Sequence, residues 1–234
     1  MRRCRRNRPA FDAAGSLSMA TRKSRAKALA KKPIVAKDSD PQSWLFLNPN
    51  GPSEAGLVFG VLRKQFGGRT NSAAEFARRK LQPVAPPGDA EASPWPVTAV
   101  RAEVILPQRA DDILADPQTL MQAMDQAAIE REKALLIYLT LPLADVDRLH
   151  DGWERVWAFV REQFARDRQL AVLMALHSPG QVNSANPLHC HCLIVPRRLG
   201  GLGLAHGAYD EELIRDAGQT IMEAAWAEHV ATFR

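Results

Sequence analysis

Residues 186–196 read NPLHCHCLIVP and carry two of the six histidines of the chain, one residue apart. In an extended strand, alternate side chains point to opposite faces, so His189 and His191 share one face. Cys190 and Cys192 then share the other face, where we expect them to pack as small apolar side chains. The stretch therefore predicts two imidazoles that point the same way.

A third histidine ends the apolar stretch upstream. Residues 170–177 read LAVLMALH, which predicts a buried strand that ends at His177. A short link through Pro179-Gly180 brings this strand beside the later histidines. Three neutral imidazoles on one sheet face make a divalent-metal site with open coordination positions. We therefore predict that His177, His189 and His191 bind a metal; the competing interpretation is that they are ordinary core or surface histidines.

The composition is that of a soluble globular protein with a basic tail. The 234 residues are 46% hydrophobic and 24% charged, and the formal net charge is +5. Residues 1–37 hold twelve lysines and arginines and one acid, which leaves nineteen basic and twenty-five acidic residues elsewhere. No apolar run approaches the roughly 20 residues of a membrane span, and the first arginines precede no apolar signal-peptide core. We expect a cytoplasmic protein with no membrane partner.

Two parts are predicted, a tail at 1–42 and one domain at 43–234. The tail has few large apolar side chains to bury, so we expect it to be disordered. Its basic residues either contact DNA phosphates or form a solvated extension. Met19, which basic residues follow, is an alternative start of the chain.

Apolar patterns predict about five strands and four helices in the body. Strands are expected at 57–63, 98–107, 134–141, 170–177 and across the two neighbouring histidines. Helices are expected at 70–80, 117–133, 144–166 and 210–230, the first capped by Thr70 or Asn71. Residues 44–56 and 82–97 are predicted to be irregular. These elements favour an α+β domain whose mainly antiparallel sheet of about five strands is covered by helices.

Several segments together resemble the histidine core of the MobA/MobL family of plasmid-mobilisation relaxases. They are 175–179 (ALHSP), 186–191 (NPLHCH), Arg197-Arg198 and 201–203 (GLG). The family belongs to the HUH endonucleases, in which a histidine-bound cation polarises a DNA phosphate and a tyrosine attacks it. The resemblance extends over residues 56–230. It implies a relaxase-like fold and the same three histidines as metal ligands.

The nucleophile position departs from the family pattern. Residues 68–78 are similar to the segment that carries the family's tyrosine, but Phe76 occupies the tyrosine's place. Phenylalanine has no hydroxyl and cannot form a phosphotyrosine link. Tyr138 lies within an apolar run and is predicted to be a core residue. Tyr209, in the loop after the histidines, is the candidate substitute nucleophile, with an exposed loop aromatic as the alternative.

Basic side chains predict the surface that contacts DNA. Residues 63–80 carry six basic side chains against one acid, Glu75. The residues predicted to contact a DNA backbone are Arg69, Arg78, Arg79, Lys80, Arg197 and Arg198. A solvated arginine pair is the alternative at 197–198.

The leading hypothesis is a MobA/MobL-like relaxase that binds single-stranded DNA at a transfer origin. Mg²⁺ or Mn²⁺ is the expected cation, with Zn²⁺ as the alternative. Nicking in plasmid mobilisation or conjugation would need Tyr209 or a metal-bound water as the nucleophile. The alternative is a catalytically inactive relaxase-like protein that binds DNA or other mobilisation proteins. A small-substrate metallohydrolase would depend on the three histidines alone. We expect a minimal form or a fragment, because no helicase or primase sequence follows.

Overall fold

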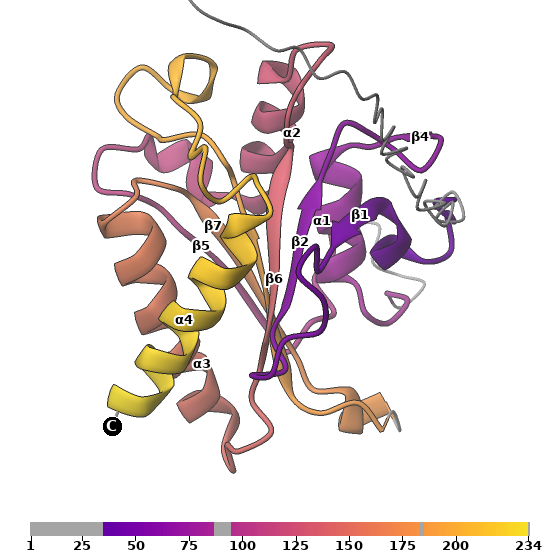
Figure 1. Ribbon diagram of the computed structural model, residues 1–234, viewed down its shortest axis with the longest axis vertical. Coiled ribbons are helices and arrows are strands. Elements are labelled where there is room, and N and C mark those ends of the chain that lie inside the picture. The colour runs from indigo at the N-terminus through magenta and orange to yellow at the C-terminus, as the bar shows by residue number, and fades with distance from the viewer. Residues whose placement is uncertain (1–34, 87–94, 183–184, 234) are drawn as a thin grey trace, which may run out of the picture. The chain divides into compact units, whose positions relative to one another are not determined.

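The computed structural model describes residues 35–86, 95–182 and 185–233. Most of the predicted tail, with Met19, lies outside these ranges. Within them, six strands form one sheet in the order β1-β2-β6-β8-β7-β5, and helices cover both of its faces (Figure 1). The predicted α+β class with an antiparallel sheet is confirmed.

Every pairing in this sheet is antiparallel. Its strands are β1 (Leu45–Leu47), β2 (Val58–Leu62), β5 (Arg101–Ile105), β6 (Leu136–Pro142), β7 (Val172–His177) and β8 (His189–Ile194). A separate hairpin consists of β3 (Gln65–Phe66) and β4 (Arg69–Thr70). Its turn is made by Gly67 and Gly68, both at positive φ, a conformation that glycine adopts without a Cβ penalty.

The α-helices of the described residues are α1 (Ala73–Leu81), α2 (Pro117–Ala127), α3 (Leu149–Val160) and α4 (Ala217–Thr232). A π-helical turn, Arg161–Arg166, continues α3. Shorter 3-10 turns are η1 (Pro41–Trp44), η3 (Asp112–Ala115), η5 (Pro179–Val182) and η6 (Leu204–His206). Among the described residues, none of the helices combines the length and the apolar character that crossing a bilayer requires.

Two amino-terminal segments are more ordered than the sequence indicated. Residues 35–42 were assigned to the tail, yet Lys37 and Asp40 form a β-bridge and η1 begins at Pro41. Residues 44–56 were predicted to be irregular, yet Leu45–Leu47 pairs with β2 as an edge strand. Tertiary pairing explains both segments, because neither has a periodic pattern of its own.

Three helix boundaries also differ from the prediction. The helix expected at 117–133 ends at Ala127, and those expected at 144 and 210 begin at Leu149 and Ala217. At the last of these, the Asp210 carboxylate accepts a hydrogen bond from the Leu213 N–H, which holds a turn in place of the first helical residues. The cap of α1 is Ser72, whose hydroxyl accepts from the Glu75 N–H.

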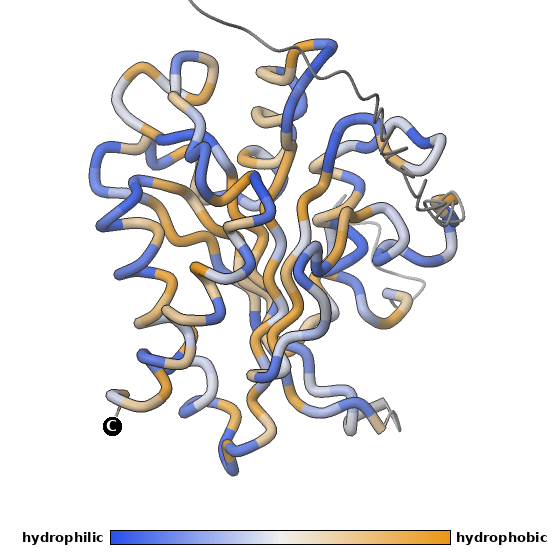
Figure 2. The backbone as a smooth tube through the Cα atoms, in the orientation of Figure 1, coloured by the Kyte–Doolittle hydropathy of each residue, from blue (hydrophilic) through white to orange (hydrophobic). Residues whose placement is uncertain are grey.

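The two faces of the sheet are covered by different helices. α1 and α2 cover one face, and α3 and α4 cover the other (Figure 1). The strands between these layers are largely hydrophobic (Figure 2). Cys190 and Cys192 are fully buried on the α3–α4 face, together with Trp153 and Phe159, which confirms that the cysteines are core residues. The histidine side chains therefore point toward the α1–α2 face.

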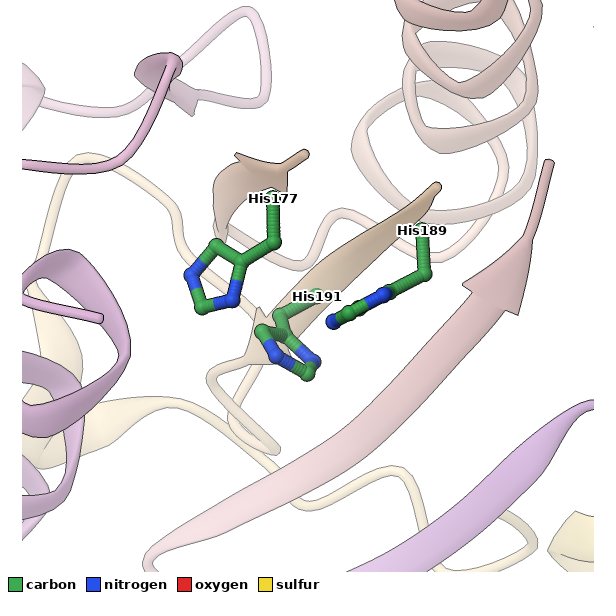
Figure 3. Close-up of side chains that lie close together, drawn as sticks. All are labelled: His177, His189 and His191. Atoms are coloured by element: carbon green, nitrogen blue, oxygen red, sulfur yellow. The ribbon is translucent and has the colours of Figure 1, made fainter. Parts of the chain in front are cut away.

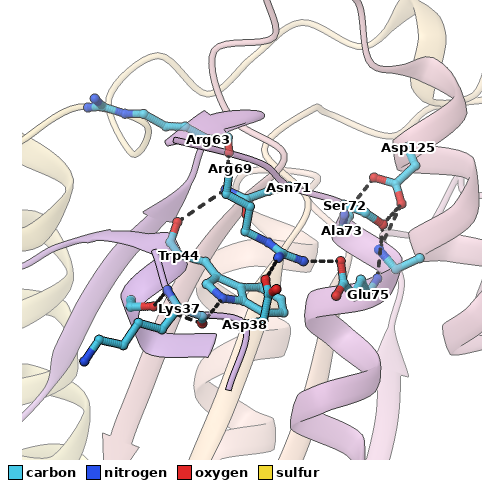
Figure 4. Close-up of polar contacts among 12 residues, drawn as sticks. Lys37, Asp38, Trp44, Arg63, Arg69, Asn71, Ser72, Ala73, Glu75 and Asp125 are labelled. Atoms are coloured by element: carbon cyan, nitrogen blue, oxygen red, sulfur yellow. Dashed lines mark hydrogen bonds and ion pairs between the residues drawn. The ribbon is translucent and has the colours of Figure 1, made fainter. Parts of the chain in front are cut away.

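Helix α1 is held at its first turn by a carboxylate of α2. Asp125 accepts hydrogen bonds from the Ser72 hydroxyl at 2.6 Å and from the N–H groups of Ala73 and Ala74 at 2.7 and 3.0 Å (Figure 4). These are N–H groups that a helix leaves without an internal partner, and a negative charge is favourable there. The contact fixes the start of α1 against α2.

Arg69 joins the amino-terminal segment to α1. Its guanidinium forms ion pairs with Asp38 and Glu75 and lies over the Trp44 ring, 4.0 Å from the ring centroid (Figure 4). Trp44 in turn packs on Phe76 of α1. Arg69 and Trp44 therefore connect the segment before β1 to helix α1.

Candidate metal centre

The register of the sheet brings the three histidines together. His177 of β7 is the direct cross-strand partner of His189 of β8. His191 lies two residues along β8, opposite Ala175 of β7 and Thr140 of β6. The ring centroids are 4.4–5.3 Å apart, and one ring nitrogen from each residue lies within 4.8 Å of the others. Figure 3 shows the three rings turned toward one another.

Backbone carbonyls fix the tautomers of two of these histidines. His177 Nε2 lies 2.6 Å from the Lys80 carbonyl oxygen, and His189 Nδ1 lies 2.8 Å from that of Pro187. A carbonyl oxygen only accepts, so each of these nitrogens carries the proton. The lone pairs left for a metal are those of His177 Nδ1 and His189 Nε2. Such outer hydrogen bonds are the usual way in which metal-binding histidines are oriented.

Two hydroxyl groups contact the third histidine. His191 Nδ1 lies 2.9 Å from the Tyr138 hydroxyl and 3.0 Å from Thr140 Oγ1. Thr140 Oγ1 donates to the Tyr138 hydroxyl at 2.8 Å. The Tyr138 ring is stacked on the imidazole with 5.4 Å between centroids. His191 is thus held through Nδ1, which leaves Nε2 as its second site.

The protein environment keeps the three imidazoles neutral. Burial lowers the pKa of His177 to about 4, and the nearby His189 and Lys80 charges act in the same direction. Burial also lowers the pKa of His189 and, more strongly, that of His191, and the Lys80 charge again adds to the effect. A neutral imidazole is the form that binds a metal, so the site needs no deprotonation at neutral pH.

A pocket of about 400 Å³ opens at the histidines. Its lining includes His189, His191, Thr140 and Lys80, with Asp40 at the amino-terminal side. Burial lowers the pKa of Lys80 to about 8, while the Asp40 charge opposes the shift. Its ammonium lies 5.0 Å from the centroid of the Tyr138 ring and 5.5 Å from that of Phe76. The pocket thus places one amino group beside the imidazoles.

Phe76 lies one aromatic ring away from the histidine cluster. It is fully buried, and its ring meets the Tyr138 ring edge-on with 5.5 Å between centroids. Tyr138 is the ring stacked on His191. Helix α1 therefore brings to the site the position that the family resemblance assigns to the tyrosine, but with an apolar side chain.

The Tyr138 hydroxyl is the functional group that sequence reasoning missed. The predicted burial of Tyr138 is correct, because the residue is 0% exposed. Its hydroxyl nevertheless belongs to the histidine cluster, and burial raises its pKa far above the usual range. The available signal was Thr140, a second hydroxyl two residues along an apolar strand and hence on the same face.

The structure does not bring Tyr209 to the histidines. Its backbone bridges to that of Arg197, and its hydroxyl accepts a hydrogen bond from Arg197 Nη2 at 3.1 Å. Arg197 follows the end of β8, whereas His189 begins it. Eight residues of extended chain span on the order of 25 Å. In this arrangement Tyr209 is too far away to attack a phosphate held at the histidines.

The six predicted DNA contacts divide into exposed and internal side chains. Arg78 and Arg79 are exposed on α1, and Arg198 is exposed after β8. Lys80 is largely buried and lines the histidine pocket. These four residues are placed where they can meet a ligand.

The other two arginines are engaged within the fold. Arg69 is held by its two carboxylates and Trp44. Arg197 is 6% exposed and forms an ion pair with the buried Glu132 at 2.8 Å. A buried guanidinium with a buried carboxylate partner is not accessible to a DNA phosphate, so the predicted role of Arg197 needs correction. The sequence could not indicate this pairing, since 65 residues separate the two.

No protein-family model and no curated protein matches this chain. Among solved structures, it is similar to a plasmid relaxase chain from Staphylococcus aureus, determined in work on the molecular basis of vancomycin resistance transfer. The identity is 17%, the match covers 58% of this chain and 71% of that chain, and the TM-score is 0.45. This likeness is too distant to assign a function.

Proposed function

We propose that this protein is a relaxase-like DNA-binding protein that holds a divalent cation at His177, His189 and His191 and a single-stranded DNA phosphate in the adjoining pocket. One observation supports this most directly: three oriented, neutral imidazoles converge beside a pocket that also contains a lysine. Plasmid DNA at a transfer origin, with other mobilisation proteins, is the setting that the sequence resemblance implies.

The donor set fits a transition-metal ion better than Mg²⁺. In the part of the chain that the structure describes, the group at ligand spacing contains three histidines and no carboxylate. Imidazole nitrogens suit Zn²⁺ and its neighbours, whereas Mg²⁺ prefers oxygen ligands. We therefore expect affinity to fall in the order Zn²⁺, Mn²⁺, Mg²⁺. A bound cation would supply a Lewis acid that polarises a phosphate oxygen.

The residues around the pocket have distinct proposed roles toward DNA. The Lys80 ammonium, beside His189 and His191, is placed to contact a phosphate oxygen. Arg78 and Arg79, exposed on the same helix, are placed to contact neighbouring phosphates. These contacts would position the DNA backbone without reading its sequence.

A catalytically inactive form of the same protein is the second candidate. Phe76 is packed in an aromatic cluster at the position assigned to the nucleophile. The Tyr138 hydroxyl is buried, and Tyr209 lies at the other end of β8. These three observations favour metal-dependent DNA binding without a phosphotyrosine intermediate.

Two measurements on the full chain test these proposals. Calorimetric titration with Zn²⁺, Mn²⁺ and Mg²⁺ compares the wild type with His191→Ala and with the control His206→Ala, an exposed histidine in η6. Fluorescence anisotropy of a mixed-sequence single-stranded oligonucleotide, with Mn²⁺ or with EDTA, measures DNA binding. Loss of metal binding in His191→Ala alone, with weaker DNA binding in EDTA, is expected. DNA binding that is equal in all conditions would contradict the proposal.

A denaturing gel of the same reactions distinguishes the two candidates. A covalent protein–DNA adduct would establish a tyrosine nucleophile and overturn the inactive form. A nick without an adduct would indicate water as the nucleophile. Intact oligonucleotide in the presence of metal-dependent binding is the outcome that we expect from Phe76.

A further inference from the structure

We infer that Tyr138 and Thr140 are positioning residues that hold His191 in the tautomer whose Nε2 is free to bind the cation. This inference depends on the metal site proposed above and goes beyond it, because it assigns a role to two hydroxyl groups outside the ligand set. Both belong to β6, the neighbour of β8, and Thr140 is the direct cross-strand partner of His191.

His191 differs from the other two histidines in what its second nitrogen contacts. His177 and His189 each face a carbonyl oxygen, which fixes the proton on one nitrogen. His191 Nδ1 instead faces two hydroxyl groups, at 2.9 and 3.0 Å, and a hydroxyl either donates or accepts. The tautomer of His191 is therefore set by the direction of the hydroxyl protons.

Two arrangements of these protons satisfy the hydrogen bonds. In the first, the Tyr138 hydroxyl donates to His191 Nδ1, so the imidazole proton lies on Nε2 and blocks that nitrogen. In the second, His191 Nδ1–H donates to the hydroxyl oxygens and leaves the Nε2 lone pair free. Only the second arrangement has three ligand nitrogens.

The Thr140 hydroxyl favours the second arrangement. Its single proton is donated to the Tyr138 oxygen, so at His191 Nδ1, 3.0 Å away, the Thr140 oxygen acts as an acceptor. His191 Nδ1–H then donates to the hydroxyl oxygens, and the Nε2 lone pair is free for a cation.

Packing restricts Tyr138 to this role. The ring is fully buried between Phe76, which meets it edge-on, and His191, on which it is stacked. A side chain held on both faces keeps its hydroxyl at Nδ1 without loss of rotamer freedom on binding. Removal of an outer hydrogen bond of this kind typically lowers metal affinity about 10–100-fold.

The experiment compares Tyr138→Phe, Thr140→Val and the double variant with the wild type. Phenylalanine retains the ring and its packing, and Thr70→Val in β4 is the matched control for loss of a strand hydroxyl outside the pocket. Two quantities are measured at pH 7.5: the Kd for Zn²⁺ by competition with a chromogenic chelator, and the tautomer of His191 by long-range ¹H–¹⁵N spectra of histidine-labelled protein with and without Zn²⁺. Far-ultraviolet circular dichroism checks that each variant folds.

We expect the wild type to show Nδ1–H at His191 when Zn²⁺ is bound. The double variant should bind Zn²⁺ about 10–100-fold more weakly and show a larger share of Nε2–H without metal. Each single variant should lie between, and Thr70→Val should match the wild type. A folded double variant with wild-type Kd and wild-type tautomer overturns the positioning role while the metal site stands. A wild type that binds no Zn²⁺ overturns both.

Discussion

One polar cluster lies at each end of strand β8. The polar atoms of the first cluster converge beside a pocket, whereas those of the second pair with one another inside the fold. At the start of β8, His189 and His191 direct nitrogen atoms toward a third imidazole beside a pocket. Beyond its end, Arg197 directs its guanidinium inward, to the Glu132 carboxylate, the Tyr209 hydroxyl and backbone carbonyls. Both clusters combine a tyrosine with a basic residue, so their composition alone does not separate them.

The difference lies in whether the charged groups are paired with one another inside the fold. The Arg197–Glu132 pair is buried, with side-chain exposures of 7% and 0%. Its charges neutralise one another within the fold, which is what a structural ion pair does. Each histidine, by contrast, is anchored through one nitrogen and has a second one available. A candidate site is therefore better recognised by lone pairs that converge beside a pocket than by the residue types present.

The largest effect on stability is expected from breaking the Arg197–Glu132 ion pair. Arg197→Met leaves the Glu132 carboxylate buried without its partner, and removal of one member of such a pair costs about 3–5 kcal/mol. Urea denaturation should show this loss in the free energy of unfolding. If the variant still folds at low temperature, its Zn²⁺ affinity should equal that of the wild type. A change of less than 1 kcal/mol would place the pair among ordinary surface ion pairs.

The next effect concerns the histidine cluster. His191→Ala removes one of three ligands and should weaken Zn²⁺ binding at least 100-fold, which corresponds to about 2.7 kcal/mol. Its effect on stability without metal should be smaller than that of Arg197→Met. Calorimetry measures the affinity and urea denaturation the stability. Equal losses of stability in both variants would erase the distinction between the two clusters.

A pH dependence of stability should come from the histidine end of β8. Burial lowers the pKa of His177 from 6.5 to about 4 and lowers that of His189. Below pH 6.5 the unfolded chain therefore binds protons that the folded site does not bind. The stability present above pH 6.5 should fall as the pH is lowered toward 4. Urea denaturation of wild type and His177→Gln in EDTA should give a shallower decline for the variant.

The smallest effect is expected from Tyr209→Phe. The change removes the hydroxyl that accepts from Arg197 Nη2 while the ring remains. One such hydrogen bond contributes about 1 kcal/mol, somewhat more when the partner is charged. Thermal unfolding should record a small decrease in Tm. Loss of DNA cleavage in this variant would instead show that Tyr209 reaches the cation in a conformation different from this one.

Local sequence patterns were sufficient for strands β2, β5, β6, β7 and β8 and for the histidine cluster. The alternation at His189-Cys190-His191-Cys192 predicted both the shared face of the imidazoles and the burial of the cysteines, because period-2 alternation depends on strand geometry alone. His177 could be included in the predicted site because it ends an apolar strand, and a short connection brings the strand of His189 and His191 back beside it. Predictions of this kind need no knowledge of distant partners.

Contacts between residues far apart in the chain determine the roles of Arg197 and Tyr138, which the sequence did not predict. Arg197 was predicted to contact DNA because its partner Glu132 lies far away in the chain. Tyr138 was recognised as core but not as a neighbour of His191, since the pairing of β6 with β8 is not encoded in either strand. In both cases tertiary pairing determined the role of a polar atom.

All three histidines of the proposed metal site lie in one β-hairpin, which has a consequence for folding kinetics. Few residues separate His177 from its cross-strand partner His189, so forming this pairing costs little chain entropy compared with pairings such as β2 with β6. The three histidines are thus close together in the sequence, whereas other pairings of the sheet join segments far apart in the sequence. A cation present during refolding should stabilise this hairpin early and raise the folding rate. Stopped-flow refolding with and without Zn²⁺ measures that contribution, and an unchanged rate would show that the hairpin forms after the rate-limiting step.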